Sequence, residues 1–138
     1  MATARAWFSA NFSKLGLHQG FGISVTLPEV VGPQIALDLL LSGRRVDGAQ
    51  AAAVGLVDAV VPPEELRERA VARAEELASA APLAVRSIRQ TMRGDLADRV
   101  RAAVAHERQE QERLQGTSDF GEGIAAAIER RTPRFVGR

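Results

Sequence analysis

Beyond Gly32 the chain is divided into short segments by residues that start and stop α-helices. Proline or a capping Asp, Ser or Thr precedes most apolar segments, and glycine or proline follows. This pattern predicts five or six helices, over residues 33–42, 48–54, 63–80, 82–96, 98–114 and 118–131. The stretch between 56 and 61 is valine-rich and indicates a short strand or an extended segment. Such a chain lacks the strands for an α/β domain of its own.

The first 32 residues differ from the rest. Gly16, Gly20 and Gly22 lie close together, and glycines at this spacing allow positive φ and close backbone approach. They predict a shaped loop. The apolar alternation at 23–27 suits a short strand and the first turns of a helix equally well. We therefore expect a loop region over 1–32 and a helical part over 33–138.

The composition argues against several functions. The 138 residues carry 18 Lys and Arg against 17 Asp and Glu, so the net charge of +1 predicts binding neither to nucleic acid nor to an anionic membrane. Cysteine is absent, which removes disulfides, thiolate metal ligands and a cysteine nucleophile, and we expect no metal site. No apolar run approaches the roughly 20 residues of a membrane span. With no secretory pattern at the N-terminus, we expect a cytoplasmic protein.

Two helices have distinctive surfaces in the sequence. The helix at 33–42 is apolar nearly all round, which predicts that it is buried. The helix at 98–114 is highly charged with sparse apolar positions, which predicts that it is largely solvated.

Several stretches resemble, in order and spacing, the C-terminal half of an enoyl-CoA hydratase/isomerase (crotonase-family) protein. The resemblance runs from Phe8 to Arg138. Its blocks are the loop at 8–22, LPEVVG at 27–32, LLLSGRRVDGAQA at 39–51, GLVDAVVP at 55–62, APLAV at 81–85, and DFGEGIAA with the following ERR and PRF at 119–135. Each block alone is weak evidence, and their shared order over most of the chain is strong evidence.

The resemblance implies a mainly α fold: the C-terminal part of the crotonase (ClpP/crotonase-like) fold, without the spiral β core. Residues 1–32 would continue from that missing core. Residues 33–138 would form the helical part that mediates trimerisation and completes the acyl pocket. The implied partners are acyl-CoA and either further copies, as a trimer or a dimer of trimers, or a missing N-terminal half upstream of Met1. Coenzyme A would enter only as part of the substrate, with no tightly bound cofactor.

The resemblance also locates the candidate catalytic residues. Both oxyanion-hole donors of the family come from the N-terminal half, which has no counterpart here. One usual carboxylate position is occupied by Phe12 and another by Gly20, so neither position can transfer a proton. His18 is the titratable replacement in that loop, because imidazole exchanges protons near neutral pH, although a loop residue bonded to backbone or water fits it as well. Glu29 is a weaker candidate, and His106 is expected at the surface.

Basic residues near the C-terminus are the candidate phosphate ligands. Arg130 aligns with a family residue that reaches the 3′-phosphate of CoA, and Arg131 or Arg134 could replace it. The guanidinium fork suits phosphate. A solvated basic helix end that complements the helix dipole explains the same residues equally well. The three loop glycines are expected to shape the loop, not to bind phosphate.

Two functional hypotheses follow. The first is the C-terminal portion of an enoyl-CoA hydratase/isomerase-family protein, a lyase or isomerase of fatty-acid metabolism that acts on or binds acyl-CoA thioesters and is inactive alone. The second is a non-catalytic helical module for oligomerisation or acyl-CoA binding. An all-α regulatory or nucleic-acid-binding protein fits poorly, because the arginines are balanced by glutamates. A lone half should also expose a large apolar surface.

Overall fold

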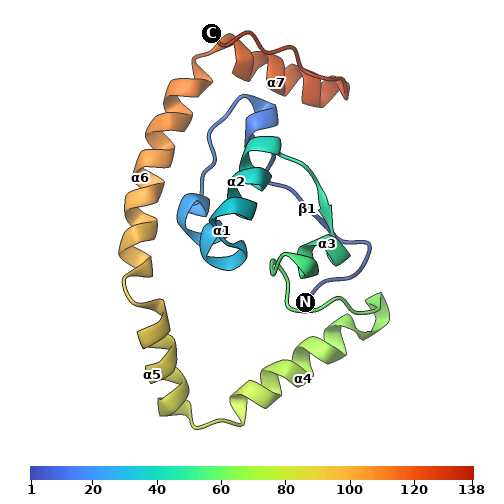
Figure 1. The fold of residues 1–138 in the computed structure, drawn as a ribbon, viewed down its shortest axis with the longest axis vertical. Helices are drawn as coiled ribbons and strands as arrows, with labels where there is room; N and C mark the ends of the chain where they lie inside the picture. The colour runs from blue at the N-terminus through green and yellow to red at the C-terminus, as the bar shows by residue number, and fades with distance from the viewer. The chain divides into compact units, whose positions relative to one another are not determined.

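The computed structural model describes residues 1–138 and is mostly helical (Figure 1). The α-helices are α1 (Ile23–Val31), α2 (Pro33–Ser42), α3 (Gly48–Ala53), α4 (Leu66–Ala78), α5 (Pro82–Arg93), α6 (Leu96–Gln115) and α7 (Ser118–Glu129). Two 3₁₀ helices, η1 (Asn11–Leu15) and η2 (Pro63–Glu65), and two paired strands, β1 (Trp7–Phe8) and β2 (Val46–Asp47), complete the fold. The chain forms two compact units, one of Met1–Trp7 with Val46–Asp98 and one of Phe8–Arg45 with Arg99–Arg138.

The first unit is built around the N-terminal residues and α3. Ala2 pairs in parallel with the extended segment after α3, donating to the Ala59 carbonyl at 2.9 Å and accepting from the Val61 amide at 3.0 Å. Asp47 caps α3 by accepting from the Gln50 amide at 2.8 Å, and the Gln50 side chain accepts in return from the Asp47 amide at 3.1 Å. Gly48 is required there, because a Cβ atom would lie 2.2 Å from the Thr3 carbonyl oxygen.

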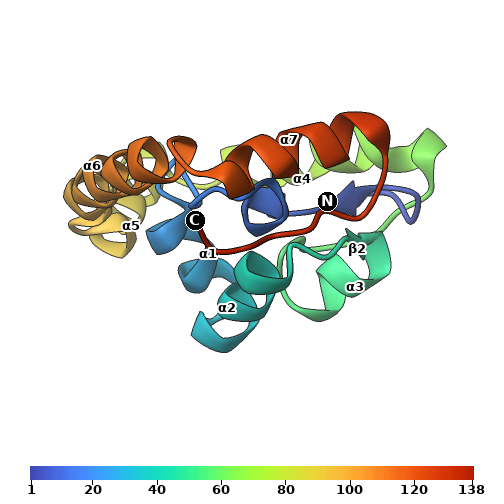
Figure 2. The same cartoon turned by 90° about the horizontal axis from the view of Figure 1, so that it is seen from above.

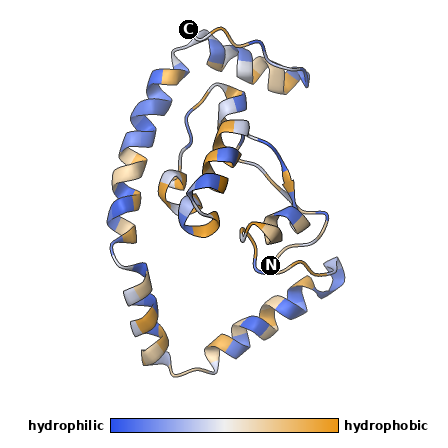
Figure 3. Ribbon diagram, viewed as in Figure 1, coloured by the Kyte–Doolittle hydropathy of each residue, from blue (hydrophilic) through white to orange (hydrophobic).

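Within the same unit, α4 and α5 bury no residue. On α5, Leu83, Ile88 and Met92 are 77%, 63% and 81% exposed. Apolar residues also recur along both helices in Figure 3, between hydrophilic ones. The helix α5 is therefore an amphipathic element whose apolar face has no cover within the chain, and α4 leaves Val71 and Leu77 47% and 56% exposed.

The second unit has a small core at the junction of α1 and α2, which lie side by side in Figures 1 and 2. Its buried apolar side chains are Leu27, Val31, Ala36, Leu39 and Ala126. The 3₁₀ helix η1 packs against both α2 and α7. On α7, Gly123 permits this contact, because a Cβ atom there would lie 2.5 Å from the Leu15 carbonyl carbon.

Most of the predicted helices are confirmed. The expected capping by Asp and Thr is found at Asp47, which starts α3, and at Thr117, which starts α7 and accepts from the Phe120 amide at 3.3 Å. The short strand or extended segment expected at 56–61 is confirmed only in part, because residues 56–58 form bends and only Val60 forms a β-bridge. The structure has seven α-helices instead of five or six, because residues 23–31 are also helical.

The expected loop region over 1–32 is wrong in extent, because it contains β1, η1 and α1. The helix α1 forms because Gly22, at φ 74°, starts it and because Leu27 and Val31 are buried in the core shared with α2. The boundary at residue 32/33 consequently falls inside a packed helix pair. The compact units divide the chain elsewhere.

The expectation that α2 is buried is also wrong in part. Ala36 and Leu39 are buried, but Leu37 and Leu41 are 55% and 69% exposed. The α6 helix is largely solvated as expected, with one exception: Glu107 is 1% exposed.

Candidate functional site

One loop of the second unit is held rigidly against α6. We call residues 16–24, between η1 and the first turn of α1, the anchored loop. The buried Glu107 carboxylate of α6 accepts from the Gly22 amide at 2.7 Å, the Ser24 amide at 3.0 Å and the Ser24 hydroxyl at 2.6 Å. One turn along α6, the Gln111 side chain donates to the His18 carbonyl at 3.0 Å. Two side chains of α6 therefore fix both ends of the segment from His18 to Ser24.

The charge of Glu107 is stabilised by these donors. Burial raises the pKa of the Glu107 carboxyl, but the hydrogen bonds from Ser24 and Gly22 and the nearby His18 outweigh burial and hold the pKa below its ordinary value. Glu107 is thus an anion at neutral pH. It also satisfies amides at the start of α1, where a negative charge is favourable.

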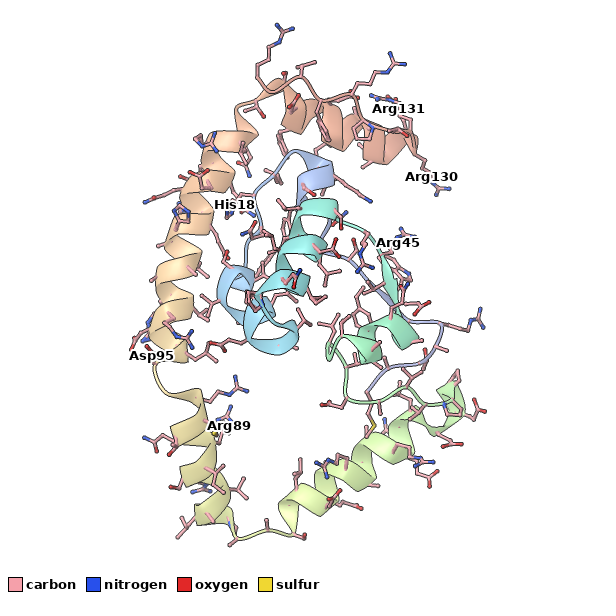
Figure 4. The ribbon with its side chains drawn as sticks, viewed as in Figure 1. His18, Arg45, Arg89, Asp95, Arg130 and Arg131 are labelled. Atoms are coloured by element: carbon pink, nitrogen blue, oxygen red, sulfur yellow. The ribbon has the colours of Figure 1, made fainter.

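His18 lies in the anchored loop, half-buried beside α6 (Figure 4). Its Nδ1 lies 2.8 Å from the Gln19 carbonyl oxygen. Because a carbonyl only accepts, Nδ1 must carry the hydrogen, which leaves Nε2 of the neutral ring with a lone pair. The His106 ring stands edge-on to the His18 ring, with centroids 5.9 Å apart. This tautomer can take a proton at Nε2.

The two vacant carboxylate positions have different surroundings. Phe12 is a half-buried residue of η1, where its ring cannot transfer a proton. Gly20 is buried in the anchored loop, and a Cβ atom there would lie 2.7 Å from Gln111 Nε2. A carboxylate at position 20 would therefore have to displace the glutamine that holds His18.

The two weaker candidates lie outside the anchored loop. Glu29 is an exposed residue of α1 that forms an ion pair with Arg99 of α6. His106 is exposed, as expected, although its ring contacts His18.

The candidate phosphate ligands are not equivalent. Arg131 is engaged by two carboxylates, with Nη1 and Nη2 at 2.5 and 2.8 Å from Glu122 and Nε at 2.6 Å from Glu129. The hydrogen bond from Arg131, together with the Arg134 amide, lowers the pKa of the Glu122 carboxyl to about 2. Arg130 is exposed at φ 55° at the end of α7. Figure 4 shows Arg130 and Arg131 at the C-terminal end of α7, away from His18.

The structure therefore does not bring all the predicted site residues together. His18 and Gly20 share the anchored loop, whereas the arginines belong to α7 and the segment after it. That segment folds back on α7, because Asp119 accepts from the Val136 and Gly137 amides at 2.7 and 2.8 Å.

Glu107 and Gln111 were not predicted from the sequence. A weak signal was available, because Val100, Val104, Glu107 and Gln111 follow a helical spacing of three and four residues and so share one face. A Cβ atom at Gly22 would lie 2.8 Å from Val100 and 3.6 Å from Val104, so this face is the one against the loop. A glutamate that continues an apolar stripe indicates a buried carboxylate.

Comparison with known proteins agrees with the resemblance at the level of the family. The sequence model of the Enoyl-CoA hydratase/isomerase family matches residues 1–138. The chain belongs to this family. It is 36% identical over 124 residues to the 2,3-dehydroadipyl-CoA hydratase of Escherichia coli, covering 90% of this chain and 49% of that protein. It is 33% identical over 138 residues to a probable enoyl-CoA hydratase of Mycobacterium bovis, covering 100% of this chain and 54% of that one.

Solved structures of the family have the same fold over this length. An enoyl-CoA hydratase/isomerase from Pseudoalteromonas atlantica superposes with a TM-score of 0.86 at 33% identity, covering 97% of this chain and 54% of that one. An enoyl-CoA hydratase from Mycobacterium avium subsp. paratuberculosis gives a TM-score of 0.87 at 30% identity, covering 97% of this chain and 55% of that one. The chain thus spans about half the length of these family members. None of its helices is long and apolar enough to cross a membrane.

Proposed function

We propose that this chain is the C-terminal portion of an enoyl-CoA hydratase/isomerase-family protein that acts on acyl-CoA thioesters. The family match over residues 1–138, with coverage of about half of each relative, carries the proposal. The order of the sequence blocks and the nearly all-helical fold support the assignment to the C-terminal half. The alternative is that the chain corresponds to the N-terminal half. The experiment below distinguishes the two assignments.

In this proposal His18 is the group that moves a proton. Its Nδ1–H donates to the Gln19 carbonyl, so Nε2 can take a proton from water or from carbon next to the thioester carbonyl. The negative charge that develops on the thioester oxygen needs two preorganised amide donors. Those donors would come from the other half of the protein, so we expect no turnover from this chain alone.

The proposal assigns the CoA phosphate to Arg130. Arg130 is exposed and has no carboxylate partner, whereas each Arg131 guanidinium nitrogen is committed to Glu122 or Glu129. Arg134 is exposed near Arg131 and would contribute long-range attraction. Coenzyme A would be present only as part of the substrate. We place the protein in the cytoplasm and in fatty-acid metabolism, as a lyase or isomerase.

A non-catalytic helical module is the second candidate function. The uncovered apolar faces of α4 and α5 favour it, since such faces mark association surfaces. Those helices would join copies of the chain into a trimer or a dimer of trimers, or would cover the other half of the protein.

The decisive experiment is calorimetric titration of the chain with crotonyl-CoA and with free CoA, alongside a hydration assay. Each measurement is made on the chain alone, and then with the separately expressed N-terminal or C-terminal half of the Mycobacterium bovis relative. Turnover only with the N-terminal half supports the proposal, and His18→Gln should then abolish it. Turnover with the C-terminal half would reverse the assignment. Turnover by the chain alone would show that catalysis needs no other half, against the proposal. Assembly of copies without acyl-CoA binding would favour the helical module.

A further inference from the structure

Phe21, at the tip of the anchored loop, combines two unfavourable features. Its φ of 64° lies in the left-handed region, which is costly for a bulky residue because Cβ crowds the carbonyl oxygen. Its side chain is also 90% exposed. An isolated exposed apolar residue is ordinary, but a strained one is not, because substitution by glycine or asparagine would relieve the strain. A strained, exposed aromatic residue calls for an explanation.

The strain at Phe21 is imposed by its neighbours. Gly20 and Gly22 on either side are buried, with Gly20 against Gln111 and Gly22 against Val100. Glu107 accepts from the Gly22 amide at 2.7 Å, and the Ile23 amide donates to the Gly20 carbonyl at 3.2 Å. The anchored loop therefore holds the Phe21 ring outward while its own backbone stays packed on α6.

The chemistry of the ring, more than the nearby charges, indicates what it contacts. On α6 the Glu107 and Glu110 carboxylates lie close enough to interact with a protonated His18, but Glu107 is buried against Gly22 and Ser24 and Glu110 is paired with Arg113 at 2.6 Å. The phenyl ring carries no charge and no hydrogen-bonding group, so a hydrocarbon chain suits it better than the phosphates of a nucleotide. Phe21 is also three residues from His18 in the same loop.

We propose that Phe21 is a binding residue for the hydrocarbon chain of the acyl group and that Glu107 positions it. This inference rests on the proposed acyl-CoA function and adds a determinant of chain-length preference. The ring offers a flat apolar surface in the same loop as the imidazole that would handle the proton, three residues away in the sequence. A longer chain covers more of that surface and so binds more tightly. The strain at φ 64° persists because the residue serves the ligand and not the fold.

The test is the variant Phe21→Asn, because asparagine tolerates the left-handed region. We expect stability and affinity to change in opposite directions. The melting temperature should rise by about 2 °C as strain is removed, while affinity for octanoyl-CoA should fall about tenfold. Affinity for acetyl-CoA stays nearly unchanged. A residue with a purely structural role would not weaken octanoyl-CoA binding while stabilising the fold. The matched control is Val30→Asn, at an exposed apolar position of α1 (53% exposed) outside the loop.

Binding is measured with octanoyl-CoA, acetyl-CoA and free CoA, on the full chain alone and with the complementary half of the Mycobacterium bovis relative. Equal losses for free CoA and octanoyl-CoA would overturn the inference, because the ring would then contact the nucleotide. A Phe21→Asn effect confined to the affinity between the halves would also overturn it, because Phe21 would then be an interface residue. Unchanged octanoyl-CoA affinity in Phe21→Asn would contradict this inference and leave the proposed function standing. If the wild type binds no acyl-CoA in either form, the proposed function fails with it.

Discussion

The two compact units of this molecule use helices in opposite ways. In the second unit, helices and the anchored loop are joined by specific contacts, with a buried carboxylate at Glu107 and glycine-mediated contacts at Gly16 and Gly123. In the first unit, α4 and α5 are regular and amphipathic but bury nothing. Helices of the second unit are thus stabilised by contacts within the chain, whereas α4 and α5 would need a partner to cover their apolar side chains. Most helical stability in proteins comes from packing an apolar face, which α4 and α5 do not do here.

The largest effect is expected from removing the buried carboxylate that organises the second unit. Glu107→Ala leaves the Gly22 amide, the Ser24 amide and the Ser24 hydroxyl without their acceptor. We expect a loss of about 3 kcal/mol in the free energy of unfolding, measured by urea denaturation. The control is Glu112→Ala on the exposed side of α6, expected within about 0.5 kcal/mol of wild type. Equal losses of unfolding free energy in the two variants would show that Glu107 stabilises this unit no more than an exposed glutamate does.

The next effect tests the close contact between α7 and η1. Gly123→Ala places a methyl group within 2.5 Å of backbone at Leu15, so we expect a destabilisation of about 2 kcal/mol from overpacking. Gly121→Ala lies on the same helix with no atom within 4 Å of its Cβ position. That variant should gain about 0.5 kcal/mol from helix propensity. Thermal melts of both variants measure the contrast, and two stabilising substitutions would mean that α7 does not pack there.

A pH dependence should distinguish the units further. The pKa of Glu107 is lowered in the folded state, so its contribution to stability is fully present above the unfolded-state pKa of about 4.3 and is lost as pH falls through the lower folded-state value. We therefore expect unfolding free energy to drop below about pH 4 in the wild type, by more than in Glu107→Gln. Urea titrations from pH 7 to pH 3 test this, and parallel curves would contradict it.

The smallest effect is expected on α5. Ile88→Gln combined with Met92→Gln removes apolar side chains that are 63% and 81% exposed. Since nothing in the chain covers them, the free energy of unfolding should change by no more than about 0.5 kcal/mol, while binding of the dye ANS should fall. A loss above about 1 kcal/mol would show that this face is covered in the isolated chain, and the contrast between the units would no longer hold.

Local signals in the sequence were enough for most helices. Proline, glycine and capping residues act through neighbouring backbone atoms, so the start of α2 at Pro33 and the cap of α3 at Asp47 were predictable. The helix α1 was not, because its apolar spacing fits a strand equally and its stability depends on contacts with α2. His18 was identified as a candidate from its place in the loop, whereas its tautomer depends on the position of the Gln19 carbonyl.

The sequence by itself determined that this is a mainly helical chain of the enoyl-CoA hydratase/isomerase family, without cysteine and nearly neutral in charge. Only the tertiary structure decided that Glu107 is buried against a loop more than eighty residues earlier, that Gln111 holds His18, and that Arg131 is paired while Arg130 is not. The reason is physical. Helix signals depend on residues a few positions apart, but burial of a charge and the choice of its partners depend on which distant backbone donors the fold brings within hydrogen-bonding distance.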